Sequence, residues 1–190
     1  MEILERSLGC VLLSTNRLND NRGWFRVGFS IADLHRLDIR FDHVEQLNHS
    51  HTEHAGVIRG LNYQEDPFAQ AKAVSCVTGA VYSVGVDITP TSPTFGQWCG
   101  WVLSPGNHRV MVVPCGYAHG FITLRDDTEL QYLTDNAYSR KHAKSIRCDD
   151  PDLSIDWTMN GVVSPRVDIL SAKNRDAPCL HEAIHGKPVA

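Results

Sequence analysis

Short apolar segments, each ended within a few residues by glycine, proline, asparagine or aspartate, are the feature that most limits how this 190-residue chain can fold. The pattern predicts strands at residues 109–113, 119–124 and 128–133, and a hairpin over residues 74–87 that turns at Thr78-Gly79. Helical signals are few, but Ser30 followed by Asp33 predicts a short helix over residues 31–37. Short strands at this spacing predict an all-β sandwich or barrel of the jelly-roll kind.

The length of the chain predicts a single domain over residues 1–190. After Trp157 the sequence becomes loop-rich, and we expect residues 160–190 to form a tail that packs against the barrel. The six cysteines are scattered, with neither a CxxC pair nor the spacing of a metal site. We therefore expect reduced thiols, several of them in the core.

The charge balance limits the possible partners. With 18 basic and 22 acidic residues the formal net charge is -4, which argues against nucleic acid and anionic membranes. Apolar runs stay well below the roughly 20 residues of a membrane-spanning helix. The first residues start acidic and lack the long apolar core of a signal peptide, so a cytoplasmic protein is expected.

Polar residues recur two positions apart within apolar segments, and a period of two places each pair on one face of a strand. The pairs are Gln46 with Asn48, Asn62 with Gln64, and Gln70 with Lys72. If these faces line the inside of a barrel, they form a polar ligand cavity in an apolar wall. If the sheet is open, they face solvent, and periodicity alone does not decide between the two.

Six motifs follow one another along the chain: DNRGWF from Asp20, GVIRGLNYQ from Gly56, SPTFGQW from Ser92, PCGYAHGF from Pro114, YLTDNAY from Tyr132 and DDPDLSIDW from Asp149. In order and separation they resemble the dTDP-4-dehydrorhamnose 3,5-epimerase family over about residues 5–180. The resemblance implies a cupin jelly roll and a homodimer that exchanges strands. It also implies a nucleotide-linked 4-keto-6-deoxy sugar as ligand, in deoxysugar biosynthesis, and proton exchange at C3 and C5 without a metal or organic cofactor.

The same resemblance assigns roles to single positions. Those for binding are Arg22 at the diphosphate, Phe25 and Tyr138 at the nucleotide, and Gln46, Asn48 and Arg59 at the substrate. Those for catalysis are Lys72 near the ketone, His119 in the cavity and Tyr132 as the general acid. The alternative for each is a structural role, with Phe25 in the core, Arg59 in an ion pair and His119 in a hydrogen-bonded turn.

Three positions depart from the family pattern. Asn62, in GLNYQ, replaces the histidine that serves as the base. Asn174, four residues before Pro178 in SAKNRDAP, replaces the aspartate that holds that base, although a shifted alignment would restore an acid at Asp176. Ser83 stands where an aspartate near the lysine is usual. The sequence therefore predicts an altered site that still binds the ligand.

These replacements bear directly on catalysis because an amide does not accept a proton near neutral pH. Loss of a positioned base typically costs about 10²- to 10⁴-fold in rate, or roughly 3 to 5 kcal/mol of barrier. Asn62 and Asn174 can instead bond to each other and keep the cavity polar. Lys72 is the best remaining base, since Ser83 offers it no charge partner and burial lowers a lysine pKa. Tyr132 and His119 are the other candidates.

Three functions compete. The first is a nucleotide-sugar epimerase or isomerase with a non-standard base, acting at one or both carbons. The second is a non-catalytic nucleotide-sugar-binding protein, or the partner of an active paralogue. The third is a metal cupin, because residues 48–54 read NHSHTEH and His119 echoes a cupin motif. We interpret His49, His51, Glu53 and His54 as solvated loop residues, with the first two facing away from Asn48, and expect no metal.

Overall fold

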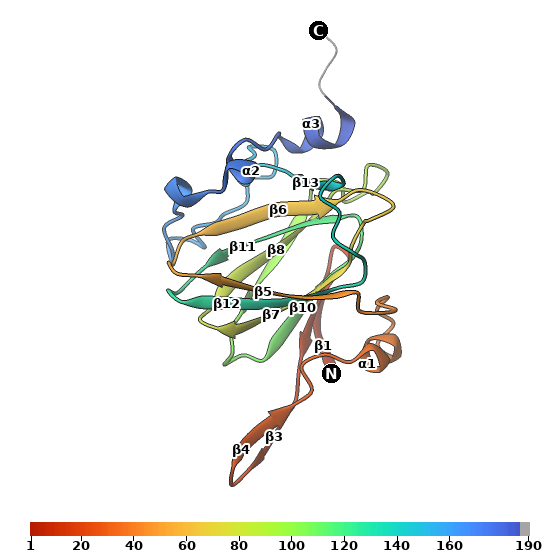
Figure 1. Ribbon diagram of the computed structural model, residues 1–190, viewed down its shortest axis with the longest axis vertical. Helices are drawn as coiled ribbons and strands as arrows, with labels where there is room; N and C mark the ends of the chain where they lie inside the picture. Colours follow the sequence, from red (N-terminus) through yellow and green to blue (C-terminus); the bar gives the residue numbers. More distant parts are fainter. Residues whose placement is uncertain (187–190) are drawn as a thin grey trace.

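The computed structural model describes residues 1–186, and two antiparallel sheets form its body (Figure 1). The larger sheet has the order β1 (Glu2–Ser7), β2 (Cys10–Ser14), β10 (Arg109–Val113), β7 (Lys72–Thr78), β12 (Thr128–Thr134) and β5 (Gln46–Thr52). The smaller has the order β13 (Ala143–Ser145), β6 (Ile58–Gln64), β11 (Tyr117–Thr123), β8 (Val81–Asp87) and β9 (Trp98–Leu103). The prediction of an all-β fold with a few short helices is confirmed.

Several local predictions agree with the structure. The strands β10, β11 and β12 occupy the three predicted segments, with ends that differ by at most two residues. The predicted helix is α1 (Ile31–Arg36), and the Ser30 side chain caps it by accepting a hydrogen bond from the Asp33 amide at 3.2 Å. Gln70, by contrast, precedes β7 and is not part of a strand, so its predicted pairing with Lys72 on one strand face is wrong.

The predicted hairpin over residues 74–87 is also wrong. Its two strands, β7 and β8, lie in different sheets, where β7 pairs with β10 and β12 while β8 pairs with β11 and β9. The link turns at Gly79, whose φ of +75° suits glycine, and an added Cβ would lie 2.2 Å from Thr128 Oγ1. Because both strands are apolar and buried, the same pattern fits a hairpin and a crossing between facing sheets.

The strand β2 of the larger sheet is buried on both faces. Along β2, Cys10 and Leu12 join the cluster between the two sheets, and Val11 and Leu13 join a second cluster on the outer face. Leu34 of α1 belongs to this second cluster and is fully buried. Burial on both faces explains why β2 is a continuous apolar run and does not alternate with polar residues.

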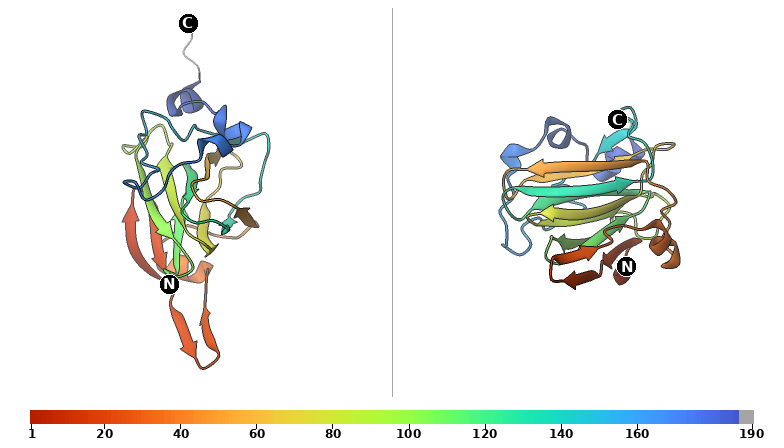
Figure 2. Two further views of the ribbon diagram at one scale, coloured as in Figure 1. Left: turned by 90° about the vertical axis from the view of Figure 1, so that its left-hand side faces the viewer. Right: turned by 60° about the horizontal axis from the view of Figure 1, so that its bottom comes forward.

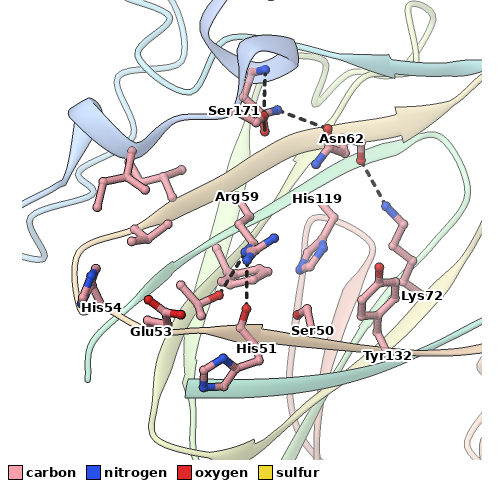
Figure 3. Close-up of a pocket in the computed structure, with 16 residues that line it drawn as sticks. Ser50, His51, Glu53, His54, Arg59, Asn62, Lys72, His119, Tyr132 and Ser171 are labelled. Atoms are coloured by element: carbon pink, nitrogen blue, oxygen red, sulfur yellow. Dashed lines mark hydrogen bonds between the residues drawn. The ribbon is translucent and has the colours of Figure 1, made fainter. Parts of the chain in front are cut away.

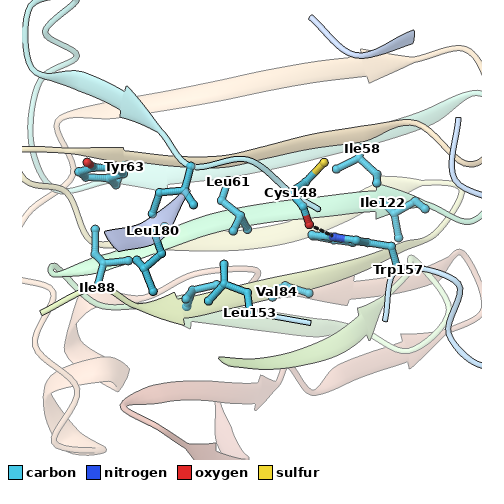
Figure 4. Packing of buried hydrophobic residues seen from close by; sticks show 13 residues of the cluster. Ile58, Leu61, Tyr63, Val84, Ile88, Ile122, Cys148, Leu153, Trp157 and Leu180 are labelled. Carbon is cyan, nitrogen blue, oxygen red and sulfur yellow. Dashed lines mark hydrogen bonds between the residues drawn. The ribbon is translucent and has the colours of Figure 1, made fainter. Parts of the chain in front are cut away.

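The last part of the chain covers the outer face of the smaller sheet (Figure 4). It carries a 3-10 helix (Val167–Ile169), α2 (Ala172–Arg175) and α3 (Leu180–His185). Leu180 is 2% exposed in a cluster with residues of β6, β8 and β11. The indole of Trp157, in the same cluster, donates to the Cys148 carbonyl at 2.7 Å. This packing fixes α2 beside β6, where the two elements are in contact.

The hairpin of β3 (Arg17–Asp20) and β4 (Gly23–Arg26) extends away from both sheets (Figures 1 and 2). All six cysteines are unpaired and four are buried, as expected. Within residues 1–186, the helices are too short and too polar to cross a membrane.

Candidate active site

A cavity of about 530 Å³ opens between the two sheets (Figure 3), and a second cavity of about 340 Å³ adjoins it. Five residues line both: Asn62, Lys72, Tyr132, Ser171 and Asn174. The larger sheet supplies one wall through β5, β7 and β12, and the smaller sheet supplies the other through β6 and β11. The polar residues spaced by two on β5 and β6 line these cavities. Of the two predicted arrangements, the polar strand faces that line an internal cavity are therefore confirmed, and polar faces directed to solvent are not.

Asn62 and Asn174 are hydrogen-bonded to each other, as the sequence predicts. Asn174 Nδ2 donates to Asn62 Oδ1 at 3.3 Å, and Ser145 Oγ donates to the same oxygen at 2.7 Å. The Asn174 side chain is buried, and its Oδ1 accepts from Ser171 Oγ at 2.9 Å. Ser145, Asn62, Asn174 and Ser171 thus form a continuous chain of neutral hydrogen-bonding groups beside the cavity.

Lys72 begins β7 and is 9% exposed. Its Nζ donates to the backbone carbonyl of Asn62 at 3.1 Å, the one hydrogen bond this amine makes within residues 1–186. Burial lowers the pKa of Lys72 to about 8, and repulsion from Lys173 adds to the effect while Cys115 opposes it. The direction agrees with the expectation for a buried lysine without a carboxylate partner.

His119 lies opposite Asn62 in the pairing of β11 with β6 and is also buried. Its Nε2 is 2.9 Å from the hydroxyl of Ser83, so Ser83 contacts this histidine instead of the lysine. Burial, together with the nearby charge of Lys72, lowers the pKa of His119 to about 3. The imidazole is therefore neutral near pH 7 and a weak base.

Tyr132 and Arg59 face the cavity from opposite sheets. Burial raises the pKa of the Tyr132 phenol above its ordinary value, and the charge of Arg59 partly opposes this. The phenolic oxygen makes no hydrogen bond within the described part of the chain. Arg59 Nε donates to Thr52 Oγ1 at 3.0 Å, and its terminal nitrogen donates to the His51 carbonyl at 2.9 Å. These bonds hold the guanidinium at the cavity edge.

The second cavity gathers three of the predicted binding residues. Gln46 and Asn48 alternate along β5 and line it, and Tyr138 lies at its rim with 60% of its surface exposed. Gln46 Oε1 accepts from the Tyr138 amide at 2.8 Å. The amide of Gln46 therefore fixes the start of the loop that carries Tyr138.

Arg22 and Phe25 lie away from these cavities, on the projecting hairpin (Figure 1). The Arg22 side chain is 85% exposed and pairs with Asp20 at 2.6 Å, and Phe25 is 63% exposed. Neither residue contributes to the site of its own chain. The structural alternative of Phe25 as a core residue is wrong, since the ring faces solvent.

The histidine-rich segment differs from its prediction in one respect. His49 and His51 belong to β5 and not to a loop, although their side chains do face away from Asn48. His51 pairs with Asp127 at 3.4 Å. Glu53 and His54 follow the strand and line the mouth of the larger cavity. Within residues 1–186, no three His, Cys, Asp or Glu side chains form a group that could hold a metal ion.

Sequence reasoning missed several polar groups of the site. Ser145 reaches Asn62 through the pairing of β13 with β6, a register that no sequence pattern revealed. Ser171 begins α2 in an S-x-x-N pattern, which signals a helix cap and not a site residue. Ser50 Oγ is buried at the cavity and has no hydrogen-bond partner in the described residues. Asp176, the alternative acid, caps the end of α2 and does not line the cavity of Asn62.

The chain is similar to known proteins over nearly its whole length. The family described as dTDP-4-dehydrorhamnose 3,5-epimerase matches residues 7–182. A relative with that name from Shigella flexneri is 38% identical over 178 residues, which cover 93% of this chain and 98% of the relative. A crystal structure of dTDP-4-dehydrorhamnose 3,5-epimerase from Bacillus anthracis with TDP and PPi bound is 38% identical, with a TM-score of 0.85 over 94% of this chain and 98% of that one.

A second structure extends the comparison to a sugar ligand. It is dTDP-6-deoxy-D-glucose-3,5-epimerase from Legionella pneumophila in complex with dTDP-4-keto-L-rhamnose. It is 34% identical, with a TM-score of 0.86 over 95% of this chain and 93% of that one. The family match, the identity and the shared fold all extend over nearly the whole length. The chain therefore belongs to the dTDP-4-dehydrorhamnose 3,5-epimerase family.

Proposed function

We propose that this protein binds a dTDP-linked 4-keto-6-deoxy sugar and processes it in deoxysugar biosynthesis, with a chemistry that differs from that of a 3,5-epimerase. The observation that carries the proposal is the hydrogen bond between Asn62 and Asn174 at the wall of a polar cavity between the two sheets. Lys72, His119 and Tyr132 all line this cavity, which supports retained ligand binding and a relocated base. The base that we assign is Lys72.

The protein is proposed to act as a homodimer. The resemblance to the family implies that Arg22 and Phe25 contact the nucleotide, yet they lie on a hairpin that projects away from the cavity of their own chain. Exchange of this hairpin between two chains brings both residues to the partner's cavity. An exposed aromatic ring and an arginine suit a base and a diphosphate respectively.

A non-catalytic binding protein is the second candidate, favoured by the same pair of asparagines. Calorimetry with dTDP and with dTDP-4-keto-6-deoxy-glucose tests the binding that both candidates require. Incubation of that sugar in D₂O, followed by NMR at C3 and C5, then separates them. Deuterium at either carbon supports an enzyme, and binding without deuterium supports the non-catalytic protein. Absence of binding to both ligands contradicts both.

Sedimentation of the purified protein tests the dimer, and mixing two inactive or non-binding variants tests the exchange. A variant of Arg22 and a variant of Lys72 each lack one part of the site. A mixed dimer restores one complete site if the hairpin of one chain serves the cavity of the other. Recovery of about a quarter of the wild-type sites at equal mixing is the expected result, and no recovery argues against exchange.

A further inference from the structure

Two buried cysteines come from facing sheets, at the edge of the molecule away from the cavities. Cys10 begins β2 of the larger sheet, and Cys99 lies on β9, the last strand of the smaller sheet. Both belong to the cluster between the sheets, where Cys10 is 0% and Cys99 is 8% exposed. The strand β5, at the other end of the larger sheet, lines both cavities, and neither cysteine lines them. Chemistry at these thiols is therefore separate from the candidate active site.

A glycine brings the two sulfur atoms together. Gly85 of β8 is paired with Cys99 in the antiparallel ladder. Residues that are directly opposite in such a ladder have their Cβ positions on one face, about 4.5 to 5.5 Å apart. A Cβ added at Gly85 would lie 2.7 Å from Cys10 Sγ. The Cys10 thiol therefore occupies the space of the missing side chain and lies beside Cys99.

Side-chain contacts hold the two sheets close together at this edge. Cys99 Sγ donates to the Ser7 carbonyl at 3.4 Å, and Ser7 is the residue paired with Cys10 across the β1–β2 ladder. The indole of Trp101, also on β9, donates to Glu5 Oε2 of β1 at 2.9 Å. A disulfide needs such a close approach, because the Cα atoms of bonded cysteines are usually about 4.4 to 6.8 Å apart.

The two thiols differ in accessibility and acidity. A hydrogen bond with the Cys10 thiol lowers the pKa of Cys99, although burial opposes this effect. The same contact raises the pKa of Cys10, and burial adds to the rise. The thiolate is the reactive form of cysteine, and a reactive thiol that is followed by a second one nearby forms a disulfide. Cys99 is therefore the thiol that reacts first, and Cys10 is the one that completes the bond.

We propose that Cys10 and Cys99 are a redox modification site, at which hydrogen peroxide forms a reversible disulfide that ties the two sheets together. The Cys99 thiolate attacks one peroxide oxygen, the O–O bond breaks, and a sulfenic acid and hydroxide form. The Cys10 sulfur then attacks the Cys99 sulfur, the S–O bond breaks, and the hydroxyl leaves as water with the Cys10 proton. The thiols lose two electrons and two protons, and peroxide becomes two molecules of water. This inference does not depend on the proposed function.

The test treats the reduced, folded full-length protein with hydrogen peroxide, then denatures it, alkylates the remaining thiols and digests it for mass spectrometry. The expected product is a peptide pair joined through Cys10 and Cys99, lighter by two hydrogen atoms and separated again by dithiothreitol. The exposed Cys115 reports that the oxidant has acted. Oxidation of Cys115 with both Cys10 and Cys99 still alkylated overturns the inference. A bond from either residue to another cysteine, or between two chains, also overturns it.

A third buried thiol provides a matched control. Cys76 lies in the same cluster at 1% exposed, but its thiol donates to the Thr78 carbonyl of its own strand at 3.0 Å. Oxidation should raise the melting temperature of the wild type and of Cys76→Ala by roughly 5 to 15 °C, because a bond between residues 10 and 99 closes a long loop of the unfolded chain. Cys10→Ala should show no such rise and should keep Cys99 as a sulfenic acid that dimedone traps. A rise that persists in Cys10→Ala, or is absent from the wild type, overturns the inference.

Discussion

Replacing Lys72 by methionine is expected to change how the stability of the protein depends on pH. The lysine is 9% exposed, and its Nζ has a single backbone carbonyl as hydrogen-bond partner in the described chain. Burial is the main reason that its pKa falls from the ordinary 10.5 to about 8, with repulsion from Lys173 second. The folded protein therefore holds this proton less tightly than the unfolded chain does.

The sign of the effect follows from proton binding. Between pH 8 and 10.5 the folded chain has largely lost the proton of Lys72, while the unfolded chain still carries it. Stability rises with pH wherever the unfolded state binds more protons. At about 1.4 kcal/mol for each tenfold change in affinity, the full rise is roughly 3 kcal/mol across this interval. Below pH 8 the buried charged lysine lowers the free energy of unfolding by the same amount, and replacing it by methionine removes this loss.

Urea unfolding at intervals from pH 7 to 10.5 measures this directly. The quantity to compare is the free energy of unfolding of the wild type minus that of Lys72→Met, because Tyr63, Cys76 and the other groups that titrate in this range are present in both proteins. This difference should become more favourable to the wild type by roughly 3 kcal/mol as the pH rises. Lys141→Met, at an exposed lysine, serves as the control and should give parallel curves. Parallel curves for Lys72→Met would refute the argument that burial destabilises its charge.

Three further results are expected. Asn62→His combined with Asn174→Asp should raise deuterium exchange at C3 or C5 by about 10²- to 10⁴-fold, measured by NMR, because it restores a held base; an unchanged rate would show that another group limits the reaction. Arg22→Ala should weaken dTDP binding in calorimetry by roughly tenfold or more without altering the free energy of unfolding, since the side chain is 85% exposed. Leu180→Ala should lower the free energy of unfolding by about 2 to 5 kcal/mol, because the residue is 2% exposed, whereas Val162→Ala, at 72% exposed, should change it by less than about 0.5 kcal/mol in urea titrations.

The sequence predicted single strands better than it predicted how they are connected. Residues 109–113 have a local apolar pattern with Pro114 behind them, and they form β10 with the predicted bounds. Which sheet a strand joins depends on contacts between distant parts of the chain, and this is why the local pattern around Gly79 predicts a hairpin that the structure does not contain. Likewise, the polar composition around His49 and His51 predicts a loop, but β12 pairs with residues 46–52, which include both histidines. Hydrogen bonding to a neighbouring strand here outweighs the composition of the segment.

In the site, too, the sequence predicts which residues take part better than it predicts their contacts. The resemblance predicts an amide in place of a base at Asn62 from one motif, and it pairs this residue with Asn174, 112 residues away, with which the structure shows a hydrogen bond. The hydrogen bond from Ser145 did not follow, because the position of this serine is set by the register of β13 on β6. An asparagine at this place could present an acceptor or a donor to the ligand, and these have opposite effects on an enolate. In this structure Asn62 Oδ1 accepts hydrogen bonds from Ser145 and Asn174, and Lys72 donates to the backbone carbonyl of Asn62, so the proposed base and the amide pair meet at a single residue of β6.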